Sequence, residues 1–432
     1  MADERGSLSR RRYLALSATA GATAAAGCPA IGGTDDGDAN TDGASGETAP
    51  TPAPTPTPTA SATPTPTPTP TATPVAKGDV VTAAYYDAGN TGASADATGV
   101  GDDPATGWKT EFEGASHQPT VADGRAFVGL RAWSLDEPNA FALDLSTGER
   151  EWAYELESYA AGPPAVVDGR AYYLDGDGTV HAIEAATGEA AWTASIGTDG
   201  EYPPLVHDGV FLAPGDSRIA ALDIASGEEL WSFRAGRGPA TAPAAAGDTA
   251  YVVTYPGDSA PRYVTALALD TGEVRWQVDS AYAQLTPPVV DGDRVYVASD
   301  NEGVAALDPA TGEQLWTTTT EPDESEMAPA VADGTLFVAT GWTLTTVGPG
   351  GTERWTHEFD QSVTTAPTVV DGVVYVGRHE KVTALDAGDG TERWSQSLGG
   401  GVTEPLTVAG GRLVAATGDH TGGNPEAVFT LQ

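Results

Sequence analysis

Side chains that could act in catalysis or bind a metal are sparse and scattered in this sequence. The only cysteine is Cys28, so the rest of the chain offers no disulfide, no cysteine-based zinc site and no thiol nucleophile. The six histidines show no i, i+2 or i, i+4 pairing and do not predict a metal cluster: His117, His181, His207, His357, His379 and His420. The sequence also lacks a G-x-S-x-G elbow, a P-loop and a dinucleotide fingerprint. We therefore expect no catalytic residues and no metal ligands.

One acidic stretch has the spacing of a calcium loop. Asp175-Gly176-Asp177-Gly178 alternates carboxylates with glycines. A Ca²⁺ site needs about six to eight converging oxygens, and no other carboxylates show a ligand spacing. Asp-Gly pairs are more often tight turns, so we predict a turn here.

Aromatic and cationic side chains on connecting segments are candidates for ligand recognition. The segments between successive repeats carry Tyr159, Glu201-Tyr202, Arg234, Arg237, Tyr282, Glu324 to Met327 and Glu404. We predict a channel-rim binding site at Tyr159, Tyr202, Arg234, Arg237 and Tyr282. Arg234 and Arg237 stand out because cations are scarce, so an anionic group would bind there. The alternative is ordinary solvated loops with packing tyrosines.

A tryptophan repeat must position these segments. Eight tryptophans recur at intervals of 39 to 45 residues: Trp108, Trp152, Trp192, Trp231, Trp276, Trp316, Trp355 and Trp394. A fixed period near 40 residues indicates one supersecondary unit copied around an axis. We expect these tryptophans to pack between neighbouring units rather than to stack on a ligand.

The pattern within one repeat predicts four short strands. Residues 288–297 read Pro-Val-Val-Asp-Gly-Asp-Arg-Val-Tyr-Val, and an Asp-Gly turn between apolar runs is a strong hairpin signal. Similar Asp-Gly turns begin at Asp123, Asp168, Asp208, Asp333 and Asp371. A third strand, a Thr-Gly turn and a fourth strand carrying the tryptophan follow. Four-stranded units of this length are the blades of a β-propeller.

The two ends of the repeat region predict how the ring closes. The stretch around Trp108 holds only a fourth strand, while the last repeat holds strands one to three and ends near Leu431. Together they make one blade, which hides both edges. We therefore predict an all-β, eight-bladed propeller whose last blade is closed by the N-terminal strand. A wrong terminal pairing would give seven or nine blades.

The first 28 residues form a predicted targeting segment. Residues 9–14, Ser-Arg-Arg-Arg-Tyr-Leu, have a twin-arginine form through Arg10 and Arg11, and an alanine-rich stretch follows. Cys28 comes directly after Ala-Ala-Gly, as in a lipobox, so we predict that it is lipidated. The alternative is an ordinary signal peptide containing a cysteine.

A Thr/Pro-rich stretch separates this signal from the repeats. We expect residues 29–77 to be a disordered linker, with alternating Thr-Pro favouring an extended polyproline II stalk. Its composition also suits O-glycosylation. The propeller is assigned to residues 78–432.

The charge balance is strongly acidic. Lys and Arg total 21 against 61 Asp and Glu, which gives a net charge of −40. Such a surface disfavours binding to nucleic acids and anionic lipids. Because the acids are spread over every repeat, adaptation to concentrated salt is favoured over one acidic site.

The Ala-x-Asp-x-x-Thr-Gly-x-x-x-Trp unit resembles the repeat of the pyrroloquinoline-quinone (PQQ) type β-propeller family. The resemblance covers about Asp103 to Gln432, and five copies keep most of the motif: those ending at Trp152, Trp192, Trp231, Trp316 and Trp394. It implies one of two branches. One contains quinoprotein alcohol and glucose dehydrogenases, which bind PQQ and Ca²⁺ at the centre of an eight-bladed ring. The other contains non-enzymatic scaffold lipoproteins, similar to the propeller subunit of the bacterial outer-membrane β-barrel assembly machine.

The dehydrogenase branch fits this sequence less well. Its members carry a vicinal Cys-Cys pair over the cofactor and insertions that build the cofactor pocket, whereas no cysteine follows Cys28 and the repeats are near minimal. We therefore expect no cofactor, with PQQ and Ca²⁺ belonging only to that alternative. A sensor or accessory subunit of a membrane complex is a third interpretation.

Signal, linker and charge together resemble those of a haloarchaeal surface lipoprotein. We predict an exported propeller, anchored through Cys28 to the outer face of the cytoplasmic membrane. It is expected to be monomeric and to act as a non-catalytic scaffold for an unidentified protein partner, without binding nucleic acid. The bacterial role does not transfer directly, because an archaeon has no outer membrane in which to assemble barrels.

Overall fold

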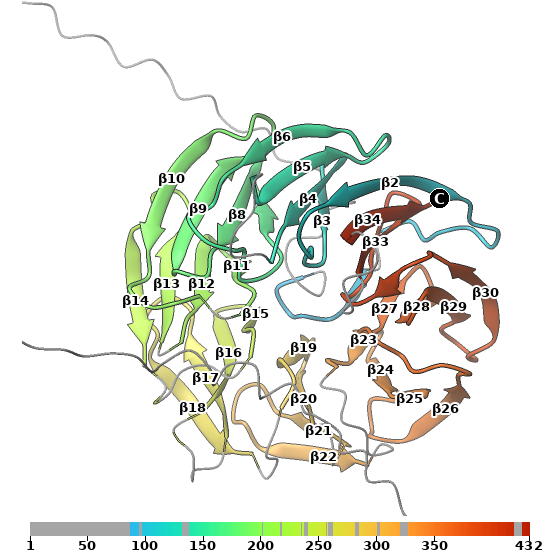
Figure 1. Ribbon diagram of the computed structural model, residues 1–432. Helices are drawn as coiled ribbons and strands as arrows, with labels where there is room; N and C mark the ends of the chain where they lie inside the picture. Colours follow the sequence, from blue (N-terminus) through green and yellow to red (C-terminus); the bar gives the residue numbers. More distant parts are fainter. Residues whose placement is uncertain are drawn as a thin grey trace, which may run out of the picture. The chain divides into compact units, whose positions relative to one another are not determined.

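The computed structural model describes residues 87–94, 97–131, 138–200, 202–216, 218–234, 236, 241–255, 257, 262–280, 285–299, 303–319, 327–418 and 426–432. All of them belong to one of the two structural units of the chain, Thr69–Gln432. Every element that they form is a β-strand, and the strands group into eight sheets (Figure 1). The predicted signal (1–28), with Arg10, Arg11 and Cys28, and the predicted linker (29–77) lie outside the described residues.

We number the sheets blade 1 to blade 8 and give the innermost strand of each first. Blade 1 contains β3 (Thr120–Ala122), β4 (Arg125–Gly129), β5 (Ala140–Asp144) and β6 (Arg150–Tyr154). Blade 2 contains β7 (Ala165–Val167), β8 (Arg170–Leu174), β9 (Thr179–Glu184) and β10 (Ala190–Ser195). Blade 3 contains β11 (Leu205–His207), β12 (Val210–Pro214), β13 (Ile219–Asp223) and β14 (Glu229–Phe233). Blade 4 contains β15 (Ala244–Ala246), β16 (Thr249–Thr254), β17 (Tyr263–Ala268) and β18 (Val274–Asp279).

The second half of the chain repeats the arrangement. Blade 5 contains β19 (Val289–Asp291), β20 (Arg294–Ser299), β21 (Gly303–Leu307) and β22 (Gln314–Thr318). Blade 6 contains β23 (Ala330–Ala332), β24 (Thr335–Thr340), β25 (Thr343–Val347) and β26 (Glu353–Glu358). Blade 7 contains β27 (Thr368–Val370), β28 (Val373–Arg378), β29 (Lys381–Asp386) and β30 (Glu392–Ser397), with β1 (Ala93–Ser94) pairing in parallel with β27. Blade 8 contains β32 (Thr407–Ala409), β33 (Arg412–Gly418), β34 (Glu426–Leu431) and β2 (Thr106–Phe112), with β31 (Gly401–Val402) also pairing with β33.

The blades form a closed ring. Each innermost strand contacts that of the next blade, in the order β3, β7, β11, β15, β19, β23, β27, β32 and back to β3. Among the four main strands of each blade the ladders are antiparallel, and the added pairing of β1 with β27 is parallel. The described residues therefore form an eight-bladed β-propeller, as the repeat predicts (Figure 1).

The predicted closure is confirmed in blade 8. The N-terminal strand β2 pairs antiparallel with β34, with Lys109 opposite Phe429 and Phe112 opposite Glu426. Beyond the strands, Ala105 and Gln432 exchange two backbone hydrogen bonds of 2.9 and 3.0 Å. Figure 1 shows the two strands side by side, one in blue-green and the other in dark red. Because β2 covers β34, the third strand of blade 8 has no open edge.

Burial follows the position of a strand within its blade. The second and third strands are almost wholly buried because a neighbouring blade covers each face, whereas the outermost strands alternate between exposed and buried residues. The core therefore consists of separate layers between blades. One layer joins Phe127 and Trp152 of blade 1 to Val166 and Tyr173 of blade 2.

The hairpins between the first two strands confirm the Asp-Gly signal, with one correction. In five blades both turn residues have positive φ, as Asp168 (52°) and Gly169 (76°) do in blade 2. In blade 5 Asp291 pairs with Arg294, so the turn is centred on Gly292 and Asp293 instead. Only Gly292 (φ 59°) is left-handed there. That hairpin was the model case for the prediction, but the extra Asp lets the turn shift by one residue.

The repeat motif is explained by the contact between adjacent blades. The Asp144 carboxylate accepts hydrogen bonds from the backbone N–H groups of Ser146 and Thr147, both at 2.9 Å. The turn places Gly148 at φ 73°, where an added Cβ would lie 2.5 Å from the Trp108 ring of the preceding blade. Bonds to the Ser146 hydroxyl and the turn backbone lower the pKa of Asp144. Asp forms the turn, and Gly leaves room for the neighbouring Trp.

Seven tryptophans bridge to the following blade through the indole N–H. Their acceptors are the carbonyls of Leu145, Ala185, Ile224, Leu269, Pro309, Pro349 and Ala387, at 2.8 to 3.3 Å. The eighth, Trp394, is buried, and no described residue accepts its N–H. It faces blade 8, where the third and fourth strands come from distant parts of the chain and no turn joins them. The acceptor is missing because that turn is missing.

The segment 87–94 lies against the innermost strands of blades 4 to 7 (light blue, Figure 1). Four of its carbonyls accept N–H groups from successive blades: Ala88 O from Ala245 (2.6 Å), Gly89 O from Val290 (2.7 Å), Thr91 O from Val331 (2.7 Å) and Gly92 O from Val369 (2.8 Å). Asn90 is 2% exposed, and its side-chain amide donates to the carbonyls of Pro243 (2.8 Å) and Pro288 (3.1 Å). One side of the central channel is thus occupied by the chain itself.

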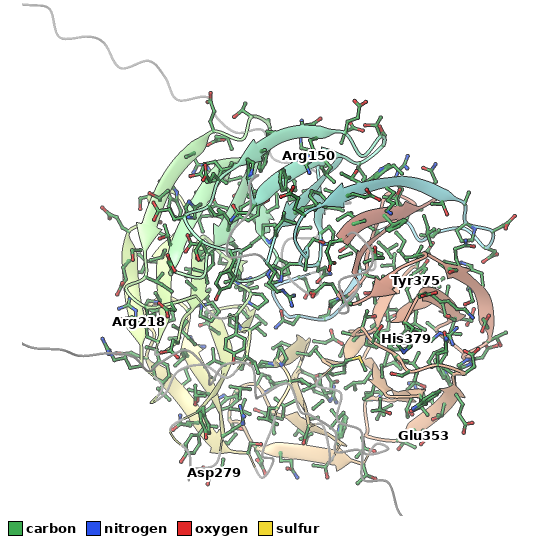
Figure 2. The ribbon with its side chains drawn as sticks, in the orientation of Figure 1. Arg150, Arg218, Asp279, Glu353, Tyr375 and His379 are labelled. Atoms are coloured by element: carbon green, nitrogen blue, oxygen red, sulfur yellow. The ribbon has the colours of Figure 1, made fainter. Side chains whose placement is uncertain are left out.

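The chain then leaves the channel between blades 7 and 8. The Val100 N–H donates to the hydroxyl of Tyr375 at 3.0 Å, and Ala97 and Val100 pack into the apolar layer between these blades. Tyr375, labelled in Figure 2, is fully buried. The 97–100 segment is therefore part of the core.

Candidate functional site

A cavity of about 340 Å³ lies where the chain enters the innermost strands of blades 8, 1, 2 and 3. It is lined by His117, Gln118, Arg131, Tyr159, Ala160, Ala161, Pro163, Pro203, Glu404 and Pro405. Most of these residues lie on the segments that lead from the outermost strand of one blade into β3, β7, β11 or β32. This volume is at the small end of the range of about 300–1,000 Å³ for ligand pockets. Strands fix both ends of each lining segment, so the ring sets the shape of the cavity.

A hydrogen-bonded chain of side chains crosses one wall of the cavity. Arg131 Nη2 lies 2.5 Å from Glu404 Oε1 and 3.1 Å from His117 Nδ1. His117 Nε2 lies 2.7 Å from the carbonyl oxygen of Ala160. A carbonyl only accepts, so His117 carries its proton on Nε2 and accepts from Arg131 through Nδ1. The wall thus links blades 8, 1 and 2.

His117 is neutral in this arrangement. Its side chain is buried, and burial lowers its pKa to about 3, with the Arg131 cation acting in the same direction and the bond to Ala160 opposing it. A group with this pKa neither takes up nor releases a proton near neutral pH. As a neutral ring, His117 therefore accepts from Arg131 and helps to orient its guanidinium.

The Arg131 guanidinium keeps donors available. Its side chain is 49% exposed, while that of Glu404 is 16% exposed. Both contacts of Arg131 use Nη2, and among the described residues none accepts a bond from Nε or Nη1. The cavity therefore presents a charge-compensated pair with unused N–H donors, beside Tyr159 and three prolines.

Tyr159 is fixed against the turn between β8 and β9. A Cβ on Gly176 would lie 2.2 Å from Cε1 of Tyr159, so the tyrosine ring packs directly on this glycine. Asp175 Oδ1 accepts from the N–H groups of Asp177 (3.1 Å) and Thr179 (2.8 Å). The Asp175–Gly178 stretch is therefore a turn, as predicted, and it supports the cavity wall.

The Asp175 side chain of this turn also belongs to a buried series of hydrogen-bonded side chains. Asp175 Oδ2 lies 3.0 Å from His181 Nε2, and His181 Nδ1 lies 3.3 Å from the hydroxyl of Tyr154. Asp175 and His181 are almost fully buried. Burial, Glu157 and Asp175 raise the pKa of Tyr154, so its hydroxyl stays protonated. This series of hydrogen bonds resembles a nucleophile relay in outline, but what it does is join the side chains of blade 1 to those of blade 2.

The structure describes three of the five predicted rim residues, and one of these three lines the cavity. Tyr159 lines the cavity. Tyr202 is half-buried next to the lining residue Pro203, and Arg234 is exposed at the end of β14; neither lines the cavity. Arg237 and Tyr282 lie outside the described residues.

Sequence reasoning missed His117 and Arg131. The residues before the innermost strand are Pro163-Pro164 in blade 2 and Pro203-Pro204 in blade 3, but His117-Gln118-Pro119 in blade 1. This departure from the repeat, shortly before Arg131 in the same blade, was the available signal.

Comparison with known proteins agrees with the architecture. Four overlapping stretches, 96–207, 142–262, 260–346 and 342–424, match the PQQ-like repeat family described as outer membrane protein assembly factor BamB. Together they cover more than half of the chain. The chain belongs to this family. PQQ-like repeats thus account for the ring from residue 96 to residue 424.

Individual relatives are more distant. The chain is 32% identical to the outer membrane protein assembly factor BamB of Moranella endobia over 106 residues, which are 22% of this chain and 26% of that protein. The match thus spans about a quarter of this relative. The crystal structure of BamB from Moraxella catarrhalis has a TM-score of 0.60 at 18% identity, covering 76% of this chain and all of that one.

A PQQ-like propeller enzyme is also similar in structure. The quinohemoprotein alcohol dehydrogenase from Comamonas testosteroni has a TM-score of 0.69 at 16% identity, covering 82% of this chain and 80% of that chain. At these identities the two structural matches show the fold. The part of the chain that the structure describes contains no helix long and apolar enough to cross a membrane.

The lining residues do not fit PQQ with Ca²⁺. Calcium takes about six to eight oxygens, yet the described residues contain no group of three or more acidic, His or Cys side chains placed to hold a metal. PQQ carries three carboxylates, and the cation in the cavity, Arg131, is already paired with Glu404. Segment 87–94 also occupies the channel face of blades 4 to 7. These residues therefore do not form a site for quinone redox chemistry.

Proposed function

We propose that this protein is a non-catalytic scaffold that binds another protein through the end of the propeller that carries the cavity. The cavity wall carries the proposal. It combines a neutral histidine, a compensated Arg131–Glu404 pair with unused donors, one fixed tyrosine and three prolines. These groups can recognise a polypeptide, but they include no activated nucleophile and no acid–base pair.

The family supports this proposal. Its description, and the name of the relative in Moranella endobia, is that of an assembly factor. A rigid ring whose connecting segments converge at one end suits the same role, because partner binding then costs little ordering of the scaffold.

The proposed location follows from the N-terminal sequence. We propose export through the twin-arginine signal at Arg10 and Arg11 and lipid anchoring through Cys28 to the outer face of the cytoplasmic membrane, in a salt-adapted cell. The Thr/Pro-rich residues 29–77 would hold the propeller away from the lipid. Replacing Cys28 with Ser should move the protein from the membrane fraction to the medium.

The scaffold role is tested by cross-linking in cells with matched variants. Arg131→Ala combined with Tyr159→Ala removes the cation and the ring from the cavity. Arg234→Ala, which removes an exposed arginine outside the cavity, is the control. We expect the control to retain the cross-linked partner and the double variant to lose most of it. Equal recovery by both would contradict binding at this cavity, and no specific cross-link in either would contradict a scaffold role.

A quinoprotein-like oxidoreductase is the second candidate, favoured by the structural similarity to a quinohemoprotein alcohol dehydrogenase. Titrating the protein with PQQ and Ca²⁺ in multimolar KCl, followed by dye-linked turnover of alcohols and sugars, separates the two. A saturable quinone band with turnover would replace the scaffold proposal.

A further inference from the structure

The innermost strands present a row of backbone N–H groups to the channel. Each of these strands has three residues and turns directly into its neighbour, so the end residues are hydrogen-bonded partners and the middle residue is not. The N–H of the middle residue therefore points away from the blade, towards the channel. Val121 in β3, Val166 in β7 and Val206 in β11 occupy this position.

Blades 4 to 7 show what such N–H groups bind. Their middle residues, Ala245, Val290, Val331 and Val369, all donate to carbonyls of segment 87–94, at 2.6 to 2.8 Å. One short stretch of chain thus crosses four blades and satisfies one donor in each. Segment 87–94 of the protein's own chain is therefore bound along the channel in the way that a separate peptide could be.

Blades 1 to 3 offer the same row without an occupant from the described chain. No described residue accepts a hydrogen bond from the N–H of Val121, Val166 or Val206. The three strands are consecutive around the ring. The segments that lead into them line the cavity through residues 117, 118, 160, 161, 163 and 203. The cavity therefore lies where the chain enters these three strands, and the strands continue the row of N–H groups to which segment 87–94 binds on blades 4 to 7.

We propose that the channel face of β3, β7 and β11 binds an extended segment of a partner polypeptide. Its carbonyl groups accept the N–H groups of Val121, Val166 and Val206, as segment 87–94 does on blades 4 to 7. The inference deepens the scaffold function and rests on it, because it names where the partner binds and in what form. The free donors of Arg131 take a further carbonyl or carboxylate oxygen at the cavity.

The internal precedent also sets the side chains that fit. A Cβ on Gly89 would lie 2.4 Å from the carbonyl oxygen of Val290, and one on Gly92 would lie 3.1 Å from that of Pro367. Asn90, between them, has a left-handed φ of 56°. A segment that follows the channel wall therefore needs glycine or other small residues where it approaches the strands, which favours a Gly- and Asn-containing sequence.

The test uses the sequence of segment 87–94 as a probe in trans. The labelled peptide Asp-Ala-Gly-Asn-Thr-Gly-Ala-Ser is titrated into the full chain, and amide exchange is measured with and without it. At ten times the Kd, exchange at Val121, Val166 and Val206 should slow about tenfold. Exchange at Val290 and Val331, which are already bonded, should not change. Binding that protects other amides, or no binding at all, would overturn the inference.

A pair of variants separates loss of the donor from loss of packing. Val166→Pro removes the N–H, while Val166→Ala keeps it and also shortens the buried side chain. The proline variant should bind the peptide about fivefold more weakly than the alanine variant, as expected for one net hydrogen bond. Equal affinities of the two folded variants would contradict the backbone contact. If the in-cell partner cross-link survives in Val166→Pro, the scaffold function stands and this binding mode is wrong.

Discussion

The contact between a turn glycine and the tryptophan of the preceding blade can be tested within blade 2. Gly188 and Gly169 have almost the same φ, 75° and 76°. A Cβ on Gly188 would lie 2.7 Å from Cγ of Trp152, whereas a Cβ on Gly169 would meet nothing within 4 Å. Replacing each with Ala imposes the same backbone strain, and only one replacement disturbs the contact between blades.

The expected magnitudes follow from these distances. A left-handed alanine costs roughly 1–2 kcal/mol, which is the whole expected loss for Gly169→Ala. Gly188→Ala adds overpacking of about 1–3 kcal/mol. It also displaces the indole from its 2.9 Å hydrogen bond to Ala185, which adds about 1 kcal/mol. We expect Gly188→Ala to lower the free energy of unfolding by about 2–4 kcal/mol more than Gly169→Ala.

Urea unfolding at a fixed multimolar KCl concentration, followed by circular dichroism, measures both variants. Repeating the pair in a Trp152→Phe background tests the mechanism, because the smaller ring leaves room for the added methyl group and the difference should shrink. If the two glycine variants lose the same stability within about 0.5 kcal/mol, the tryptophan does not hold the blades together as described.

Three further outcomes follow from the structure. Because the pKa of His117 is lowered to about 3, only the unfolded chain takes up a proton at this residue between about pH 6.5 and pH 3. The contribution of His117 to the free energy of unfolding is therefore fully present above pH 6.5, and it is lost towards pH 3 at about 1.4 kcal/mol per pH unit. His117→Gln should remove this contribution, so the free energy of unfolding should fall less between pH 7.5 and pH 5 in the variant than in the wild type. An equal fall in the two proteins would contradict the lowered pKa. Trp394→Phe should lower the free energy of unfolding by about 1 kcal/mol less than Trp152→Phe, because of these two tryptophans only Trp152 donates an indole hydrogen bond to a described residue. Equal losses of stability would show that Trp394 has an acceptor. Deleting residues 426–432 removes β34 and leaves β2 unpaired, so cooperative thermal unfolding by calorimetry should be lost, and a sharp native-like transition would argue against closure through this strand.

The architecture was predictable because its signals are local and repeated. The tryptophan period and the Asp-Gly pairs predict the blades. The lone strand around Trp108 and the three-strand last repeat predict the closure that β2 and β34 make. The hairpin at Asp291 was predicted with the wrong centre, since Asp-Gly-Asp allows two turn positions and only packing selects one.

The cavity and the occupied channel were not predictable in the same way. Arg131 and Glu404 are 273 residues apart and meet only because the ring closes. Segment 87–94 binds through its main-chain carbonyls, and backbone acceptors leave no pattern of side-chain types in a sequence. Of the three predicted rim residues that the structure describes, only Tyr159 lines the cavity, because aromatic or cationic character does not reveal which connecting segments converge.

The pairing of β2 with β34 also sets an order of events during synthesis. β2 leaves the ribosome before blades 1 to 7, yet its partner strand is made after them. Blades can form in sequence as they emerge, but the first strand stays without a partner until about three hundred further residues have been translated. An interrupted chain therefore carries an open ring with unpaired strand edges, which quality-control proteases and chaperones recognise. Ring closure thus distinguishes a finished molecule from a fragment.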